Sequence, residues 1–162
     1  MIIKIIEIVL IILALWIILS FFVALFTIPN FYFIKTRIQK SRKIKEFAKK
    51  LKGRRKEETL RNVFNYIISN YKGKEERWKV VSLFYKWYYL DIEKLLGKKQ
   101  FLPCHLHNNV FITLLINLGF KEDNFQRKII ISSFLTPHQY LIVNIGRKYK
   151  IDLFMRTFEE IY

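Results

Sequence analysis

The chain has 162 residues, one cysteine and a formal net charge of +16. A single cysteine excludes an intrachain disulfide, which fits a reducing compartment. So basic a chain suggests a nucleic-acid partner, but no RNA- or DNA-binding motif is visible, and a basic cluster directly after an apolar run has a simpler explanation in lipid and topology. We therefore expect nucleic-acid binding to be absent.

Residues 8–28 form an unbroken apolar run whose only polar members are Ser20 and Thr27. A helix of this length spans roughly 30 Å, the thickness of a bilayer core. Pro29 follows, and residues 30–33 are typical of an aromatic belt at the interface. The alternatives are a core helix or a cleaved signal peptide, although the run is long for a signal and no Ala-x-Ala site follows. Residues 1–34 are predicted to be a single-pass transmembrane anchor.

Residues 35–56 carry twelve Lys and Arg side chains and one acid, Glu46. This basic juxtamembrane segment has a partial apolar stripe, which indicates a helix lying on the membrane surface. The stripe consists of Ile38, Ile44, Phe47, Ala48 and Leu51. Basic residues beside a span favour the cytoplasmic side, so the C-terminal domain is predicted to be cytoplasmic. We also expect residues 35–56 to bind anionic lipid headgroups, by about 1 kcal/mol per basic residue.

Residues 57–162 are enough for one small domain, and its first half has helical periodicity. Three helices are predicted, at about 57–71, 74–96 and 103–118, ended by Gly73, Gly97 and Gly119. The predicted core stripe of the first helix is Leu60, Val63, Phe64, Ile67, Ile68 and Tyr71. That of the second is Trp78, Val81, Phe84, Tyr85, Tyr88, Ile92 and Leu95. That of the third is Val110, Phe111, Leu114, Leu115 and Leu118.

The second half of the domain has the pattern of strands. Residues 128–134, 139–145 and 148–153 are predicted strands, and residues 155–161 a short final helix. Asn144, Ile145 and Gly146 indicate a hairpin turn between the last two strands. Helices followed by an antiparallel sheet predict an α+β fold.

Cys104, His138 and Asp152 occur in an order and at positions that suit a thiol nucleophile. Cys104 begins a helix, whose dipole and free N–H groups stabilise a thiolate. If the hairpin turn is centred on Ile145, His138 and Asp152 lie directly opposite each other on one face of the sheet. The imidazole can then take the thiol proton, and the carboxylate can orient the imidazole. These three residues are the predicted catalytic triad.

Three segments carry a resemblance to a known family. They are Leu102-Pro103-Cys104 with the helix that ends at Leu118-Gly119, the strand and turn 138–146, and residues 148–152. In this pattern a Cys begins a helix, a His opens a strand, and an Asp follows a glycine turn and an aromatic. The last sixty residues resemble the core of the transglutaminase-like superfamily of papain-like thiol enzymes. Gln139 stands where the family often has a tryptophan.

The resemblance implies a cysteine hydrolase or acyltransferase that acts on amide bonds of proteins or peptides through an acyl-thioester. It implies no cofactor and no metal. Oxyanion donors would be the Cys104 N–H and, by analogy with papain-like sites, Gln100. The alternative is a non-catalytic membrane-surface binding or scaffold module that retains the fold. Cys104, His105 and His107 also form a C-H-x-H cluster, a weak zinc pattern because a fourth ligand and a second cysteine are absent.

Overall fold

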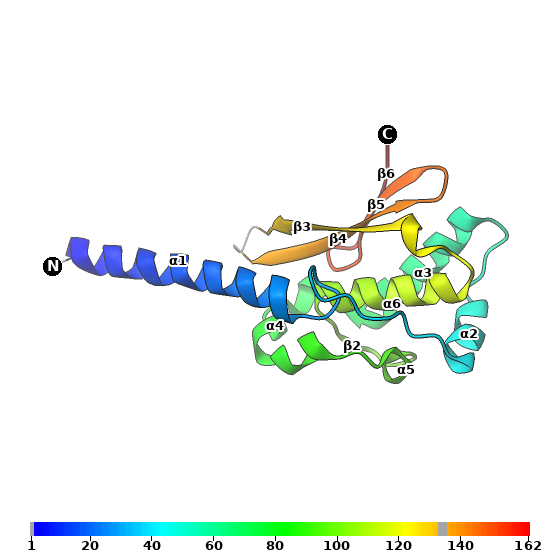
Figure 1. The fold of residues 1–162 in the computed structure, drawn as a ribbon, viewed down its shortest axis with the longest axis horizontal. Helices are drawn as coiled ribbons and strands as arrows, with labels where there is room; N and C mark the ends of the chain where they lie inside the picture. The colour runs from blue at the N-terminus through cyan, green and yellow to red at the C-terminus, as the bar shows by residue number, and fades with distance from the viewer. Residues whose placement is uncertain (1, 133–135) are drawn as a thin grey trace.

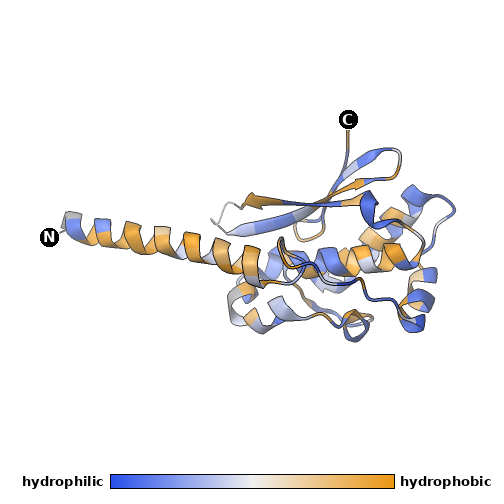
Figure 2. Ribbon diagram, viewed as in Figure 1, coloured by the Kyte–Doolittle hydropathy of each residue, from blue (hydrophilic) through white to orange (hydrophobic). Residues whose placement is uncertain are grey.

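The computed structural model describes residues 2–132 and 136–162, without the side chains of residues 2, 3 and 81. Its first element, α1 (Ile2–Thr27), projects from the remainder of the chain as one long helix (Figure 1). The part from Lys4 to Thr27 is long and apolar enough to cross a membrane, and Figure 2 shows it hydrophobic along most of its length. Only its end is covered, because Ala24 and the following Ile28 are buried.

The turn after α1 directs Phe31 into the domain. Asn30 has a φ of 60°, a left-handed conformation that asparagine tolerates. Its side chain bonds both the backbone N–H (2.9 Å) and the hydroxyl (2.5 Å) of Thr36, which closes the turn. Tyr32 and Phe33 are exposed, whereas Phe31 is buried. This burial excludes Phe31 from the predicted aromatic belt at the interface.

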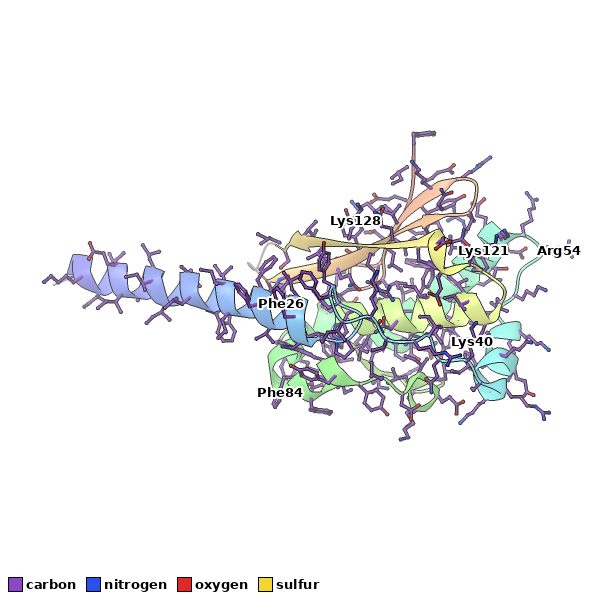
Figure 3. All side chains as sticks on the ribbon, viewed as in Figure 1. Phe26, Lys40, Arg54, Phe84, Lys121 and Lys128 are labelled. Carbon is purple, nitrogen blue, oxygen red and sulfur yellow. The ribbon has the colours of Figure 1, made fainter. Side chains whose placement is uncertain are left out.

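Helix α2 (Arg42–Lys49) belongs to the core of the domain, and the prediction that it lies on the membrane by an apolar stripe is wrong. Ser41 caps it by accepting a hydrogen bond from the N–H of Ile44. Ile44 and Ala48 are fully buried and pack in the same core as α6. In Figure 3, Lys40 and Arg54 lie toward the end of the domain opposite to α1. Protein, not lipid, covers the stripe.

Replacing Ile44 with alanine tests this placement. We expect the free energy of unfolding to fall by about 3 kcal/mol, because the substitution leaves a cavity in the core. Lys45→Ala, on an exposed position of the same helix, is the control and is expected to change it by less than about 0.5 kcal/mol. Urea unfolding of the full chain in detergent, followed by near-UV circular dichroism, measures both. Equal effects of the two substitutions would place Ile44 outside the core.

Helices α3 (Lys56–Asn70) and α6 (Cys104–Asn117) confirm two of the three predicted helices. α6 is the central helix, with the C-terminal sheet on one side and the segments of residues 74–101 on the other (Figure 1). Both predicted core stripes are buried, apart from the half-buried Ile68 and Leu118. Gly119, at a φ of 94°, ends α6 as predicted.

The predicted helix 74–96 is wrong. The segment is instead η1 (Lys74–Glu76), α4 (Lys79–Ser82), η2 (Phe84–Tyr88) and α5 (Ile92–Leu95). Two side chains explain the breaks: the Trp87 indole donates to the carbonyl of Val80, and Asp91 caps the new helix α5 at the N–H of Lys94. Of the predicted core stripe, Ile92 and Leu95 are buried, and the Val81 side chain lies outside the described part. The exposed members are Trp78, Phe84, Tyr85 and Tyr88.

A short parallel pair, β1 (Tyr71–Lys72) with β2 (Gln100–Phe101), links the end of α3 to the start of α6. The ladder extends by one bond, from the N–H of Leu102 to the carbonyl of Lys72 (3.1 Å). This pairing fixes the chain immediately before Cys104.

After the short η3 (Glu122–Asn124), four antiparallel strands form the sheet in chain order. They are β3 (Phe125–Ile131), β4 (Pro137–Asn144), β5 (Lys148–Asp152) and β6 (Thr157–Ile161). The predicted strand 128–134 begins earlier, at Phe125, and its residues 133 and 134 lie outside the described ranges. The fold is α+β, as predicted.

The prediction of a final helix at residues 155–161 is wrong, because residues 155 and 156 lie in a turn and β6 begins at Thr157. Arg156, with a φ of 63°, turns the chain back after β5. Phe158 then pairs with Ile151 and packs its ring on Phe64 and Tyr149. The packing of the half-buried Phe158 against these distant aromatic rings favours the strand, and the local periodicity does not reveal it.

Candidate active site

Cys104 is the first residue of α6, and Pro103 is its cap. The carbonyl of Pro103 accepts hydrogen bonds from the N–H groups of Leu106 and His107, both at 3.1 Å, which forms the first turn. The backbone N–H of Cys104 is one of the groups at a helix start that lack an intrahelical acceptor. The half-buried thiol therefore lies at the positive end of a 14-residue helix.

The side chains of His138 and Asp152 meet, although the strand register differs from the predicted one. Asn144 pairs with Lys148, so the turn is centred on Gly146, which has a φ of 103°. Continued along the strands, this register puts Tyr140, not His138, opposite Asp152. Because the shift is two residues, the predicted parity is kept, and the pair interacts diagonally. His138 Nε2 lies 2.6 Å from Asp152 Oδ2, and both residues are buried.

The turn after β5 holds the carboxylate in place. Asp152 Oδ1 accepts a hydrogen bond from the N–H of Met155 at 2.9 Å. Phe154, in the same turn, packs its ring 5.7 Å from the His138 ring. The backbone of Phe154 lies so close to Gly73 that a side chain there would clash with its carbonyl, at 2.6 Å. A glycine is thus required at position 73 because the backbone of Phe154 approaches it closely. The prediction that Gly73 ends a helix is wrong.

Burial raises the pKa of Cys104, but its interactions with the side chains of His105 and His138 outweigh burial and lower that pKa to about 6. Burial lowers the pKa of His138, but the bonds to Asp152 and Cys104 raise it to about 10. Because Asp152 occupies Nε2, Nδ1 is the nitrogen left for the sulfur. The lowered pKa of Cys104 and the raised pKa of His138 both favour a thiolate–imidazolium pair.

Cys104 packs against apolar residues at the end of α1 and in the turn that follows it. Ala24, Ile28 and Phe31 form a small apolar cluster with Trp87, and Cys104 packs against it. Phe31 also contacts the ring of His105 edge-on, at 5.9 Å between ring centroids. His105 Nε2 lies 2.8 Å from the carbonyl of Trp87, so this nitrogen carries the hydrogen. The sequence had indicated His105 only as part of a possible metal cluster.

Gln139 joins the turn after α1 to α6 and to the strand that carries His138. Its Nε2 donates to the carbonyls of Asn30 (3.1 Å) and Phe31 (2.5 Å). Its Oε1 accepts a hydrogen bond from Asn108 at 2.9 Å. The glutamine at a position where the resembling family often has a tryptophan was a signal of this role, because its amide has two N–H groups for the two carbonyls and an indole has one.

Gln100, the candidate oxyanion donor, is half-buried in β2, four residues before Cys104. Its Oε1 accepts a hydrogen bond from Lys86 Nζ at 2.9 Å, and Lys86 also bonds the carbonyl of Phe101. Lys86 therefore fixes the oxygen end of this amide. The amide nitrogen of Gln100, Nε2, is the end that an oxyanion donor would use.

The zinc alternative finds no support in the geometry. Within residues 2–132 and 136–162, no group of three or more His, Cys, Asp or Glu side chains is placed to hold a metal ion. His107 is fully buried, and its Nδ1 bonds the carbonyl of Pro103 at 3.2 Å. Burial lowers the pKa of His107 to about 4, so the ring is neutral. It packs edge-on against Tyr71 and Phe154.

Comparison with protein-family models, with curated proteins and with solved structures finds no match to this chain. The chemistry of the site therefore rests on its own geometry.

A shallow hollow between the end of α2 and α3, lined by Lys50, Asn62 and Tyr66 among others, lies away from the triad.

Proposed function

We propose that this protein is a membrane-anchored, transglutaminase-like cysteine hydrolase or acyltransferase that acts on amide bonds of proteins or peptides. The observation that carries the proposal is the contact between three residues from distant parts of the chain. Cys104 at the start of α6 interacts with His138, and His138 Nε2 hydrogen-bonds Asp152 Oδ2 at 2.6 Å. The three side chains thus form a chain of contacts in the order nucleophile, base and orienting carboxylate.

In the proposed reaction the Cys104 thiolate attacks the amide carbonyl carbon, and a C–S bond forms. The N–H of Cys104, with Gln100 as candidate second donor, stabilises the oxyanion. His138 gives its proton to the leaving nitrogen, the C–N bond breaks, and an acyl-thioester remains. His138 then takes a proton from water, the resulting hydroxide attacks the thioester, and the thiolate leaves. A primary amine in place of water gives a crosslink instead.

The membrane anchor belongs to the same proposal. The end of α1 and its following turn are tied into the domain through Gln139, Phe31 and the cluster around Trp87. A domain that uses the end of its N-terminal helix in this way favours a retained span over a cleaved signal. The basic residues after the span favour a cytoplasmic domain. Headgroup binding is proposed for Lys35 and Arg37, which are exposed and follow α1 directly.

A non-catalytic scaffold is the second candidate, and one observation favours it. The end of α1 packs on Cys104, so a substrate has to reach a half-buried thiol beside the anchor. A scaffold needs the fold and not the reactive sulfur.

Trapping of the acyl-enzyme separates the two candidates. The full chain in detergent is mixed with a p-nitrophenyl ester of a short peptide, quenched in acid and weighed by mass spectrometry. We expect one acyl adduct, located on Cys104, its absence in Cys104→Ala and its slower formation in His138→Ala. Adding a primary amine or only water then distinguishes transfer from hydrolysis. An adduct that forms equally in His138→Ala, or none in the unsubstituted protein, would leave only the scaffold.

A further inference from the structure

A group of large apolar side chains lies exposed on the segment between η1 and α5. Trp78, Phe84, Tyr85, Tyr88 and Leu90, here called the 78–90 patch, have exposed fractions between 45% and 67%. The surface of a soluble protein rarely exposes so many large apolar side chains within thirteen residues, and such patches mark interaction sites. Basic side chains lie among them, including Lys79, whose Nζ is 5.3 Å from the centre of the Trp78 ring.

The 78–90 patch is continuous with the end of the apolar helix. The hydroxyls of Tyr88 and Thr27 lie 3.2 Å apart, and Trp87 packs in the cluster of Ala24, Ile28 and Phe31. Along the long axis of the molecule, Phe84 lies level with Phe26, whereas Arg54 and Lys121 lie toward the other end (Figure 3). Phe26 is exposed, as are Phe22 and Phe33, whose rings stack on it.

We propose that the 78–90 patch docks onto the lipid bilayer that α1 spans, with its aromatic side chains in the interfacial layer. Continuity with α1 commits the patch to lipid, because a helix crossing the membrane at Thr27 brings the adjoining patch to the same surface. Tyr and Trp suit this layer, since one end of each ring is apolar and the other is polar. The basic segment 42–56 lies at the opposite end of the domain and does not make this contact.

The docking places the reactive centre at the level of the lipid headgroups. Cys104 packs against the same cluster that joins Trp87 to the end of α1. Insofar as the proposed function holds, the amide that Cys104 attacks therefore lies at the membrane surface. The docking itself does not depend on a reactive thiol.

Site-directed spin labelling tests the docking on the full chain in vesicles of zwitterionic phosphatidylcholine. In a Cys104→Ser background, single cysteines replace Phe84 or Trp78 in the patch. Arg54→Cys and Lys121→Cys, both at exposed positions, are the matched controls at the other end of the domain. Each label is measured for its collision rate with oxygen, which concentrates in lipid, and with a water-soluble nickel chelate.

We expect oxygen collisions to exceed nickel collisions at the two patch positions and the ratio to reverse at both controls. Labels at Phe84 and Trp78 that collide mainly with nickel would place the patch in water and overturn the proposal. Labels shielded from both reagents would indicate a protein partner or a second copy, which also overturns it. Because the background lacks the thiol, failure here is distinct from failure of the acyl-enzyme experiment.

Discussion

Replacing His138 with alanine is expected to raise the apparent pKa of Cys104 from about 6 to about 8.5 or above. The imidazolium is one of the two hydrogen-bonding groups that stabilise the thiolate, and burial alone disfavours the charged form. His105 remains in the variant and keeps one bond to the sulfur. The pH dependence of alkylation reports this pKa, because only the thiolate reacts.

The size of the effect follows from the thiolate fraction. At pH 6 a thiol of pKa 6 is half ionised, whereas one of pKa about 8.5 is ionised to about 0.3%, a difference of about 150-fold. A less basic thiolate is also a weaker nucleophile, which reduces the difference by about 15-fold. We therefore expect alkylation of Cys104 by iodoacetamide at pH 6 to slow about tenfold in His138→Ala.

The measurement is the alkylation rate of the full chain in detergent between pH 4 and 9, followed by mass spectrometry. Gln126→Ala, an exposed change on the neighbouring strand β3, is the control and should leave the profile unchanged. If His138→Ala and the unsubstituted protein share one pH profile, the thiolate–imidazolium pair does not exist.

Removing the carboxylate of Asp152 is expected to slow acylation strongly. In Asp152→Ala the His138 ring loses its partner at Nε2, and its pKa falls because the bond to Asp152 raises it most. We expect the acylation rate to fall about 100-fold or more, the scale of a general acid–base contribution. Asp152→Asn keeps an oxygen for hydrogen bonding but loses the charge. Its acylation rate should therefore lie between the rates of the unsubstituted protein and Asp152→Ala.

The pH profile separates a loss of orientation from simple unfolding. In the unsubstituted protein, acylation is expected to rise with pH near 6 as the thiolate forms and to decline near 10 as the imidazolium loses its proton. In Asp152→Asn the decline should move to lower pH, because His138 is then protonated less tightly. Asp123→Ala, an exposed carboxylate in η3, serves as the control. A decline that stays near pH 10 in Asp152→Asn would contradict the assigned role.

The elements with strong local signals were predicted correctly from the sequence. α3 and α6 repeat apolar residues at helical spacing and are buried accordingly. β4 and β5 were also predicted correctly, because Gly146 marks the turn between them. The hairpin register was wrong by two residues, but parity was kept, so His138 and Asp152 still meet.

The errors fall where a residue's partner is distant in the chain. The 74–96 segment has helical spacing, yet the Trp87 bond to Val80 and the Asp91 cap break it, and its aromatic rings lie exposed. β6 is favoured because the ring of Phe158 packs against those of Phe64 and Tyr149. Neither result follows from the local pattern, since packing against distant elements overrides propensity.

The sequence by itself determined a long apolar N-terminal helix and a cysteine, a histidine and an aspartate at positions suited to a triad, because length, composition and spacing are local properties. Only the tertiary structure decided which surfaces these features share. It placed the end of α1 on Cys104, buried the stripe of α2 in the core, and left the 78–90 patch beside the apolar helix. The physical reason is that burial is a property of pairs of elements, and a single segment does not specify its partner.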